Sequence, residues 1–243
     1  MEYWGLSETG KVRAQNQDVY RIEELDRNTV LAAVCDGMGG AKSGNIASRL
    51  AIDVFTEEVR CSYKSSMSQE QVEQLLQNAV KLANFTVYDQ ARQFADFAGM
   101  GTTLVAALIS GKNAALVNVG DSRGYHITRE GIRRLTVDHS LVQMMLDRGD
   151  LTAEEARDYP GKNYITRAVG TEPTVESDLF HVRMERGDAI LLCSDGLHNE
   201  VDDQEILFEV VHGVNNDNCC QRLLDIANMR GSPDNVTSVL VMV

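Results

Sequence analysis

Four aspartates stand where apolar, strand-like runs of the sequence begin or end. The first three follow such a run and the fourth precedes one: Asp36, Asp121, Asp195 and Asp234. Strands of one sheet or sandwich end at a shared rim, and carboxylates gathered there repel one another unless a cation neutralises them. An all-oxygen ligand set selects hard divalent ions such as Mg²⁺ or Mn²⁺. The pattern therefore predicts a metal-dependent hydrolase.

Hydrophobic periodicity predicts the elements that must position these aspartates. In the first half of the chain we expect a hairpin of 18–24 and 29–35, then one helix over 44–60 and another beginning at Ser68. A run of close strands follows, with tight hairpin connections after the first and third of them: 102–110, 113–119, 122–128 and 131–135.

The second half opens with a polar, helix-leaning segment at 141–164. We then expect a hairpin of 178–184 and 187–193, followed by two amphipathic helices and a last strand at 202–212, 216–230 and 236–243. Several strands are apolar on both faces, so helices must cover the outside of the sheets. The predicted fold is α+β, with two mainly antiparallel sheets flanked by helix pairs. Because there are only three prolines and no long polar linker, we expect a single domain over 1–243.

The composition is that of a soluble, acidic protein. Of the 243 residues, 43% are hydrophobic, which is ample for a core, and the formal net charge is −13. A phosphate backbone is bound by a basic face, so this charge disfavours a nucleic-acid partner.

The cysteines match neither a disulfide framework nor a zinc site. Their number is odd, two are adjacent and two lie within strand-like runs: Cys35, Cys61, Cys193, Cys219 and Cys220. Such thiols are expected to be reduced, as in the cytoplasm. The sequence shows neither a signal peptide nor an apolar run of transmembrane length. We therefore expect a cytoplasmic protein with no membrane partner.

Eight short motifs follow one another along the chain: Arg13-Ala-Gln-Asn-Gln-Asp18, Asp36-Gly-Met-Gly-Gly40, Gly101-Thr-Thr103, Gly120-Asp-Ser-Arg123, Asp138-His-Ser140, Ile165-Thr-Arg-Ala-Val-Gly170, Ser194-Asp-Gly-Leu197 and Asp234-Asn235. In this order they resemble the metal-dependent protein phosphatases of the type-2C (PPM) family, in the compact bacterial form. One such motif is weak evidence, whereas eight in register are specific. The resemblance runs from about Gly5 to Val243 and implies a four-layer α-β-β-α sandwich with a binuclear Mg²⁺ or Mn²⁺ centre.

Applied to this chain, the resemblance implies which residues bind each metal ion. Asp36 would bridge both ions, and Gly37 would bind the second through its backbone carbonyl. Asp195 and Asp234 would complete the shell of the first ion. Asp121, together with Asp195, would hold a third and weaker ion. The alternative for a single Asp-Gly pair at a strand end is an ordinary turn, and for Asp121 it is a turn cap at the rim.

Two further residues have roles implied by the resemblance. Asp18 would act near the ions through bound water, while its neighbour Gln17, where eukaryotic relatives often have Glu, cannot supply a negative ligand. Arg13 would bind phosphate, because a guanidinium can take two oxygens of a phosphoryl group in a fork. The alternative for Arg13 is an ordinary surface arginine. For Arg123 and Arg167 we expect structural ion pairs.

The resemblance makes the segment 141–164 a flap beside the active-site cleft. This chain departs from the common family pattern there, with Tyr159 in place of His and Lys162 in place of Arg. Some relatives also have a histidine at the position of Met38, which cannot transfer a proton, so the general acid stays open. His139 is expected to order a loop. His198 is the remaining histidine close to a motif aspartate in sequence.

The leading hypothesis is hydrolysis of phosphoserine and phosphothreonine in proteins by a hydroxide that bridges the two ions, with Arg13 neutralising the phosphoryl group. No cysteine has an arginine six positions later, so the cysteine-dependent phosphatase signature is absent. The resemblance also implies phosphoprotein partners, among them an opposing bacterial Ser/Thr kinase. The alternatives are a catalytically weak phosphoprotein-binding or scaffold domain and a metal phosphodiesterase acting on nucleotides, which the acidic balance disfavours.

Overall fold

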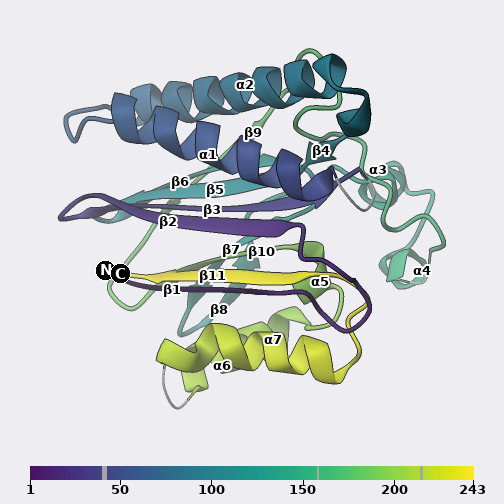
Figure 1. The fold of residues 1–243 in the computed structure, drawn as a ribbon. Helices are drawn as coiled ribbons and strands as arrows, with labels where there is room; N and C mark the ends of the chain where they lie inside the picture. The colour runs from purple at the N-terminus through teal and green to yellow at the C-terminus, as the bar shows by residue number, and fades with distance from the viewer. Residues whose placement is uncertain (40–42, 158, 214–215) are drawn as a thin grey trace.

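Two antiparallel sheets packed face to face form the centre of the molecule, and helices cover their outer faces (Figure 1). The computed structural model describes residues 1–39, 43–157, 159–213 and 216–243. The arrangement confirms the predicted α+β fold with its four layers, α-β-β-α. Gly40, the last residue of the motif that begins at Asp36, lies outside the described residues.

The first sheet contains the predicted N-terminal hairpin and three further strands of the sandwich, with one short strand beside them. Its order is β2 (Asp18–Asp26), β3 (Thr29–Met38), β5 (Leu104–Ser110), β6 (Asn113–Val119) and β9 (Asp178–Arg183), with β4 (Gly101–Thr102) paired to the end of β3. Along β3, alternate residues pack on the helices or on the second sheet, so both faces of the strand are buried.

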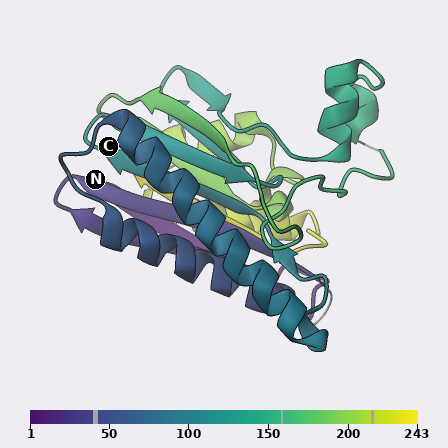
Figure 2. The same cartoon turned by 90° about the horizontal axis from the view of Figure 1, so that it is seen from above.

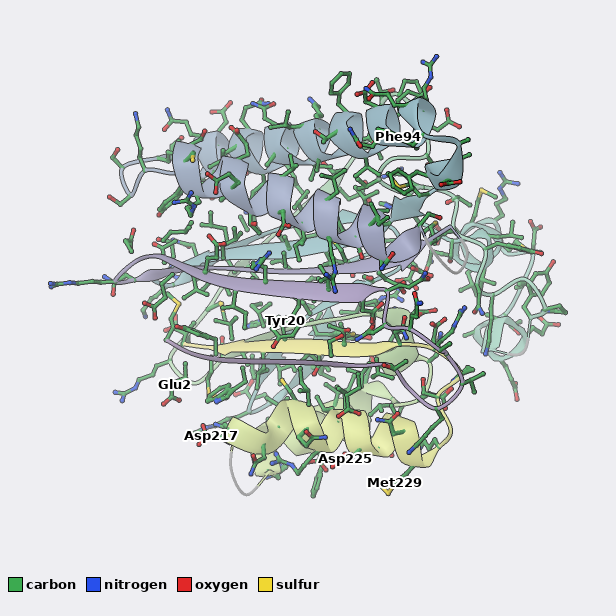
Figure 3. The ribbon with its side chains drawn as sticks, in the orientation of Figure 1. Glu2, Tyr20, Phe94, Asp217, Asp225 and Met229 are labelled. Carbon is green, nitrogen blue, oxygen red and sulfur yellow. The ribbon has the colours of Figure 1, made fainter. Side chains whose placement is uncertain are left out.

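The second sheet joins the two ends of the described chain. Its order is β1 (Glu2–Glu8), β11 (Val236–Met242), β10 (Ala189–Cys193), β7 (Arg123–Thr128) and β8 (Gly131–Arg134). The two sheets meet across a layer of aliphatic side chains that includes Val34, Leu192 and Val239. Where they approach, the Tyr20 hydroxyl donates to the Gly5 carbonyl over 2.9 Å, which links β2 to β1 (Figure 3).

One helix pair covers each sheet. The first pair is α1 (Gly44–Ser62) and α2 (Gln69–Gln93), and the second is α6 (Asp203–His212) and α7 (Cys219–Met229). The predicted start of α2 is confirmed, because Ser68 and Gln71 form a reciprocal capping box. The described chain also has two 3₁₀ turns, Ala95–Phe97 and Asn216–Asn218, and the short helix α5 (Asp195–His198). Within the described ranges, no helix is both apolar and long enough to cross a lipid bilayer.

The predicted hairpin of 178–184 and 187–193 is wrong. Its two strands, β9 and β10, lie in different sheets, so the turn between them carries the chain from one sheet to the other. Burial explains the difference. Every residue of β10 is buried, as a strand between two neighbours requires, whereas β9 has exposed positions and lies at an edge. The edge strand β1 was not predicted.

The segment 141–164 leaves the sandwich and returns to it. It contains α3 (Leu141–Arg148) and α4 (Ala153–Arg157), and Figure 2 shows both helices outside the sheets. An isolated bridge between Ser140 and Ile165 closes the base of this excursion. Asp158 lies outside the described residues.

Candidate active site

The four motif aspartates come from four separate elements and line one cavity of about 460 Å³. Asp36 stands near the end of β3, and Asp121 in the turn between β6 and β7. Asp195 begins α5, two residues after the end of β10, and Asp234 lies two residues before the start of β11. Gly37 and Arg13 line the same cavity. The expected meeting of strand ends at one rim is therefore what the chain forms.

Two threonines fix the backbone of Asp36. Its N–H donates to Oγ1 of Thr103 over 2.9 Å, and its carbonyl accepts from the N–H of Thr103 and from Oγ1 of Thr102 over 2.9 and 2.8 Å. Oγ1 of Thr103 also hydrogen-bonds Oγ of Ser122 over 2.7 Å. The Gly-Thr-Thr motif thus ties the end of β3 to the turn that carries Asp121.

Position 37 has room only for glycine. A Cβ atom there would lie 2.1 Å from the carbonyl oxygen of Gly44 and 2.8 Å from that of Gln17. The N–H of Gly37 donates to the Gln17 carbonyl over 3.2 Å. The backbone of the cavity wall therefore packs directly against the start of α1.

Asp18 lies behind the cavity wall, directly across the β2–β3 ladder from Asp36. Its side chain is buried, and Oδ2 accepts hydrogen bonds from Oγ of Ser194 and Oγ1 of Thr237 over 2.6 and 2.7 Å. Oδ1 is also buried but has no hydrogen-bond partner among the described residues. A lone buried carboxylate oxygen is costly, so this atom fits a site that holds a cation or its water shell.

Asp195 has the same feature. Its side chain is buried, and Oδ2 accepts from Nδ2 of Asn199 over 3.3 Å. Its other oxygen, Oδ1, is buried and has no partner in the described part of the chain. After Oδ1 of Asp18, Oδ1 of Asp195 is therefore a second buried oxygen that would suit a hard cation.

Asn235 attaches the N-terminal motif to the start of β11. Its Nδ2 donates to the carbonyls of Thr9 and Gln15 over 2.9 and 3.0 Å, and its Oδ1 accepts from the N–H of Gln17 over 2.8 Å. The preceding residue, Asp234, is thereby placed beside the loop that carries Arg13. Asn235 was given no role from the sequence, although its place in the Asp234-Asn235 motif could have indicated one.

The carboxylates raise one another's pKa. Burial raises the pKa of Asp36 well above its ordinary value, and the charges of Asp18, Asp195, Asp121 and Asp234 raise it further. Burial and neighbouring carboxylates likewise raise the pKa of Asp195. For Asp121, burial and then the charge of Asp138 raise the pKa to about 6. Such a set holds its full negative charge only with a neutralising cation.

The carboxylates share the cavity without meeting at one point. In the described ranges, no three acidic, histidine or cysteine side chains lie close enough together to hold one ion. Asp234 accepts from Nη2 of Arg13 at Oδ2 over 2.7 Å and from the N–H of Asn235 at Oδ1 over 2.8 Å. The donor set nevertheless fits Mg²⁺ or Mn²⁺, because all donors are oxygens and two of them are buried without partners.

Arg13 lies at the mouth of the cavity, with 54% of its side chain exposed. The hydrogen bond to Asp234 raises the pKa of the guanidinium, so Arg13 is cationic at every working pH. It is thus placed to meet an anion that enters from solvent.

The ion pairs expected for Arg123 and Arg167 are present. Arg123 donates to both oxygens of Asp138, with the shortest contact 2.7 Å, and Nη1 of Arg167 donates to Oδ1 of Asp178 over 2.9 Å. His139 orders a loop, as expected, because its Nδ1 accepts from the N–H of Gly120 over 3.0 Å. These residues support the turn that carries Asp121.

A second, larger cavity of about 990 Å³ adjoins the first and is bounded by α3, α4 and the residues that follow Asp195. Asp121, Asp195 and Asn163 line both cavities. Lys162 and His198 line the larger one, so the segment 141–164 does lie beside the aspartates. Burial lowers the pKa of His198 to about 3, which keeps its ring neutral.

Known proteins are similar to this chain in sequence and in fold. The family model of protein phosphatase 2C matches residues 10–224. Serine/threonine phosphatase stp of Listeria monocytogenes serotype 4b (strain F2365) is 35% identical over 235 residues, which cover 97% of this chain and 93% of that protein. Protein phosphatase PhpP of Streptococcus pneumoniae serotype 2 (strain D39 / NCTC 7466) is 35% identical and covers 99% of this chain and 97% of its own length.

A solved structure agrees with these matches. The crystal structure of serine/threonine phosphatase Stp1 from Staphylococcus aureus superposes with a TM-score of 0.93 at 38% identity, covering all of this chain and 94% of that one. The chain therefore belongs to the protein phosphatase 2C family and is an enzyme of the serine/threonine phosphatase type.

Proposed function

We propose that this chain removes phosphate from phosphoserine and phosphothreonine in proteins and depends on Mg²⁺ or Mn²⁺ to do so. The observation that carries the proposal is the wall of the 460 Å³ cavity, where carboxylates from four separate elements come together with one arginine. The relatives named above are serine/threonine phosphatases, which supports the same substrate class.

The proposed ligands follow from the cavity wall. Asp36, the carbonyl of Gly37, Asp195 and Asp234 would hold two ions, and Asp121 with Asp195 would hold a weaker third. Asp18 would act from behind Asp36 through water. When bound, the ions neutralise the phosphoryl group and activate a water molecule for attack on phosphorus.

The chain's own residues bind and orient the substrate. Arg13 takes the phosphoryl oxygens in its guanidinium fork and contributes positive charge where the transition state concentrates negative charge. Asp234, which is paired with Arg13 in this structure, would be a cation ligand when the ions are bound. Thr103 and Asn235 hydrogen-bond the backbone on two sides of the cavity and would thereby hold the reacting groups in position.

The proposal includes the setting in which the enzyme works. We place the whole activity in one domain over 1–243, with 141–164 as a flap beside the cavity. Partners would be phosphoproteins, including a bacterial Ser/Thr kinase that this enzyme opposes. The five free cysteines support a reducing, cytoplasmic location.

A turnover assay tests the proposal. Phosphate release from a phosphothreonine peptide is measured with Mn²⁺, with Mg²⁺ and with EDTA, beside bis(p-nitrophenyl) phosphate as a diester substrate. We expect release from the peptide that requires a divalent ion and little reaction with the diester. Folded protein that binds the peptide but never releases phosphate would instead support a scaffold, and preference for the diester would support a phosphodiesterase.

A further inference from the structure

The turn that carries Asp121 is held by a histidine on each side. From one side, Nδ1 of His139 accepts from the N–H of Gly120 over 3.0 Å. From the other side, Nε2 of His198 lies 3.0 Å from the carbonyl oxygen of Asp121. A carbonyl oxygen only accepts, so Nε2 of His198 must carry the hydrogen. His139 belongs to a motif, whereas His198 has no role in the site as described so far.

His198 is also fixed relative to Asp195. Both residues belong to the single turn of α5, which Asp195 begins and His198 ends. The N–H of the next residue, Asn199, donates to the carbonyl of Asp195 over 2.9 Å, and its Nδ2 donates to Oδ2 of Asp195. The hydrogen bond from His198 to Asp121 therefore connects the two elements that carry these carboxylates.

The other ring nitrogen shows that His198 does more than fill space. Nδ1 is buried and has no hydrogen-bond partner among the described residues. An unpaired buried acceptor destabilises a fold, so an apolar side chain would serve better if only packing were needed. The histidine supplies one polar contact, and that contact is the bond to Asp121.

We propose that His198 is a positioning residue that sets the separation of Asp121 and Asp195 and thereby the affinity for the weakest of the three ions. This inference rests on the proposed function, which assigns that ion to these two carboxylates. His198 does not touch substrate or ions in this role. It acts through the backbone of Asp121, as groups behind metal ligands commonly do.

The test compares four proteins: the unchanged chain, His198→Leu, His198→Gln and His181→Leu. Leucine keeps the bulk of His198 without a donor, while the Nε2 of glutamine reaches about as far as that of histidine. His181 pairs with Glu73 outside both cavities and serves as the control for loss of a histidine contact. Hydrogen exchange of the 120–122 amides is measured in EDTA, and Mn²⁺ binding is measured by calorimetry.

We expect His198→Leu to speed exchange at 120–122 and to weaken the weakest Mn²⁺ site by about tenfold, with the tighter sites unchanged. His198→Gln should restore most of that affinity, and His181→Leu should match the unchanged chain. Equal exchange and equal Mn²⁺ binding in His198→Leu would overturn the inference alone. If the unchanged chain bound no Mn²⁺, the proposed function would fail and the inference with it.

Discussion

The guanidinium of Arg13 is bound to the carboxylate of Asp234, with Nη2 2.7 Å from Oδ2. The residue proposed to bind phosphate and a residue proposed to bind metal are thus partners of each other. Under these proposed roles, phosphate would compete with Asp234 for Arg13, and a cation would compete with Arg13 for Asp234.

Replacing Arg13 should therefore have different effects on turnover of a phosphorylated substrate and on metal binding. Arg13→Ala is expected to lower kcat/KM for a phosphothreonine peptide by about 10- to 100-fold, the range for one charge-assisted contact. The affinity of the Arg13→Ala variant for Mn²⁺ should stay equal or increase, because Asp234 loses a competing partner. Steady-state kinetics and Mn²⁺ calorimetry measure the two effects. Arg21→Ala, which removes an exposed pair with Asp53 outside the cavity, is the control.

Asp36→Asn is expected to abolish turnover while making the metal-free protein more stable. Burial and four nearby carboxylates raise the pKa of Asp36, so its charge is unfavourable in the fold until a cation is present. Removing that charge should raise the free energy of unfolding in EDTA. Saturating Mn²⁺ at about 100 times Kd should add about 2.7 kcal/mol to the unchanged chain and little to the variant. Urea denaturation with and without Mn²⁺ measures both.

The exposed Asp96 provides the comparison for that experiment. Asp96→Asn should behave as the unchanged chain in activity and in both denaturation curves. A variant at Asp36 that kept full activity would contradict its place among the ion ligands.

The Arg123–Asp138 pair should make stability depend on pH in the acid range. Burial raises the pKa of Asp138, but the hydrogen bonds and charge of Arg123 outweigh it and leave the pKa below the ordinary 3.8. A depressed acid pKa gives stability that is present above pH 3.8 and is lost as the pH falls through the folded-state value. Asp138→Asn should cost about 3 kcal/mol at pH 7, as breaking a buried pair does, and progressively less below pH 4.

Urea denaturation in EDTA from pH 3 to 7 measures this dependence. The control is Glu185→Gln, which breaks the exposed pair with Lys112 and should leave the curves unchanged. A cost for Asp138→Asn that is the same at every pH would mean that the charge of Asp138 is not what stabilises the fold.

Gly37→Ala tests the close packing of the cavity wall. The added Cβ would lie 2.1 Å from the carbonyl of Gly44, so backbone must move. We expect a loss of about 1–3 kcal/mol in the free energy of unfolding, together with a large loss of turnover. In Gly131→Ala the new Cβ meets nothing within 4 Å, so thermal denaturation of that variant should be close to unchanged.

The sequence predicted elements whose signals are local. Ser68 and Gln71 formed a recognisable capping box, and the strands buried on both faces indicated helices outside the sheets. The turn at 185–187 gave the same local signal as a hairpin, because turn residues do not reveal whether the next strand pairs or crosses to another sheet. The edge strand β1 is partly exposed along most of its length, so its hydrophobic pattern was too weak to be recognised.

For the candidate site, the sequence predicted which aspartates come together but not the hydrogen bonds that hold them. The motif aspartates were expected at one rim, and they line one cavity. The bonds that hold them were not predictable, since Thr103 and Asn235 act on residues 67 and 218 positions away, respectively. The pairing of Arg13 with Asp234 also depends on folded geometry that no local spacing encodes.

The pairing of β1 with β11 has a consequence for synthesis. Asp234 and the strand beside it leave the ribosome long after Arg13 and Asp36 have emerged. A nascent chain that still lacks β11 therefore has an incomplete cavity wall, which closes only after this strand has left the ribosome and paired with β1.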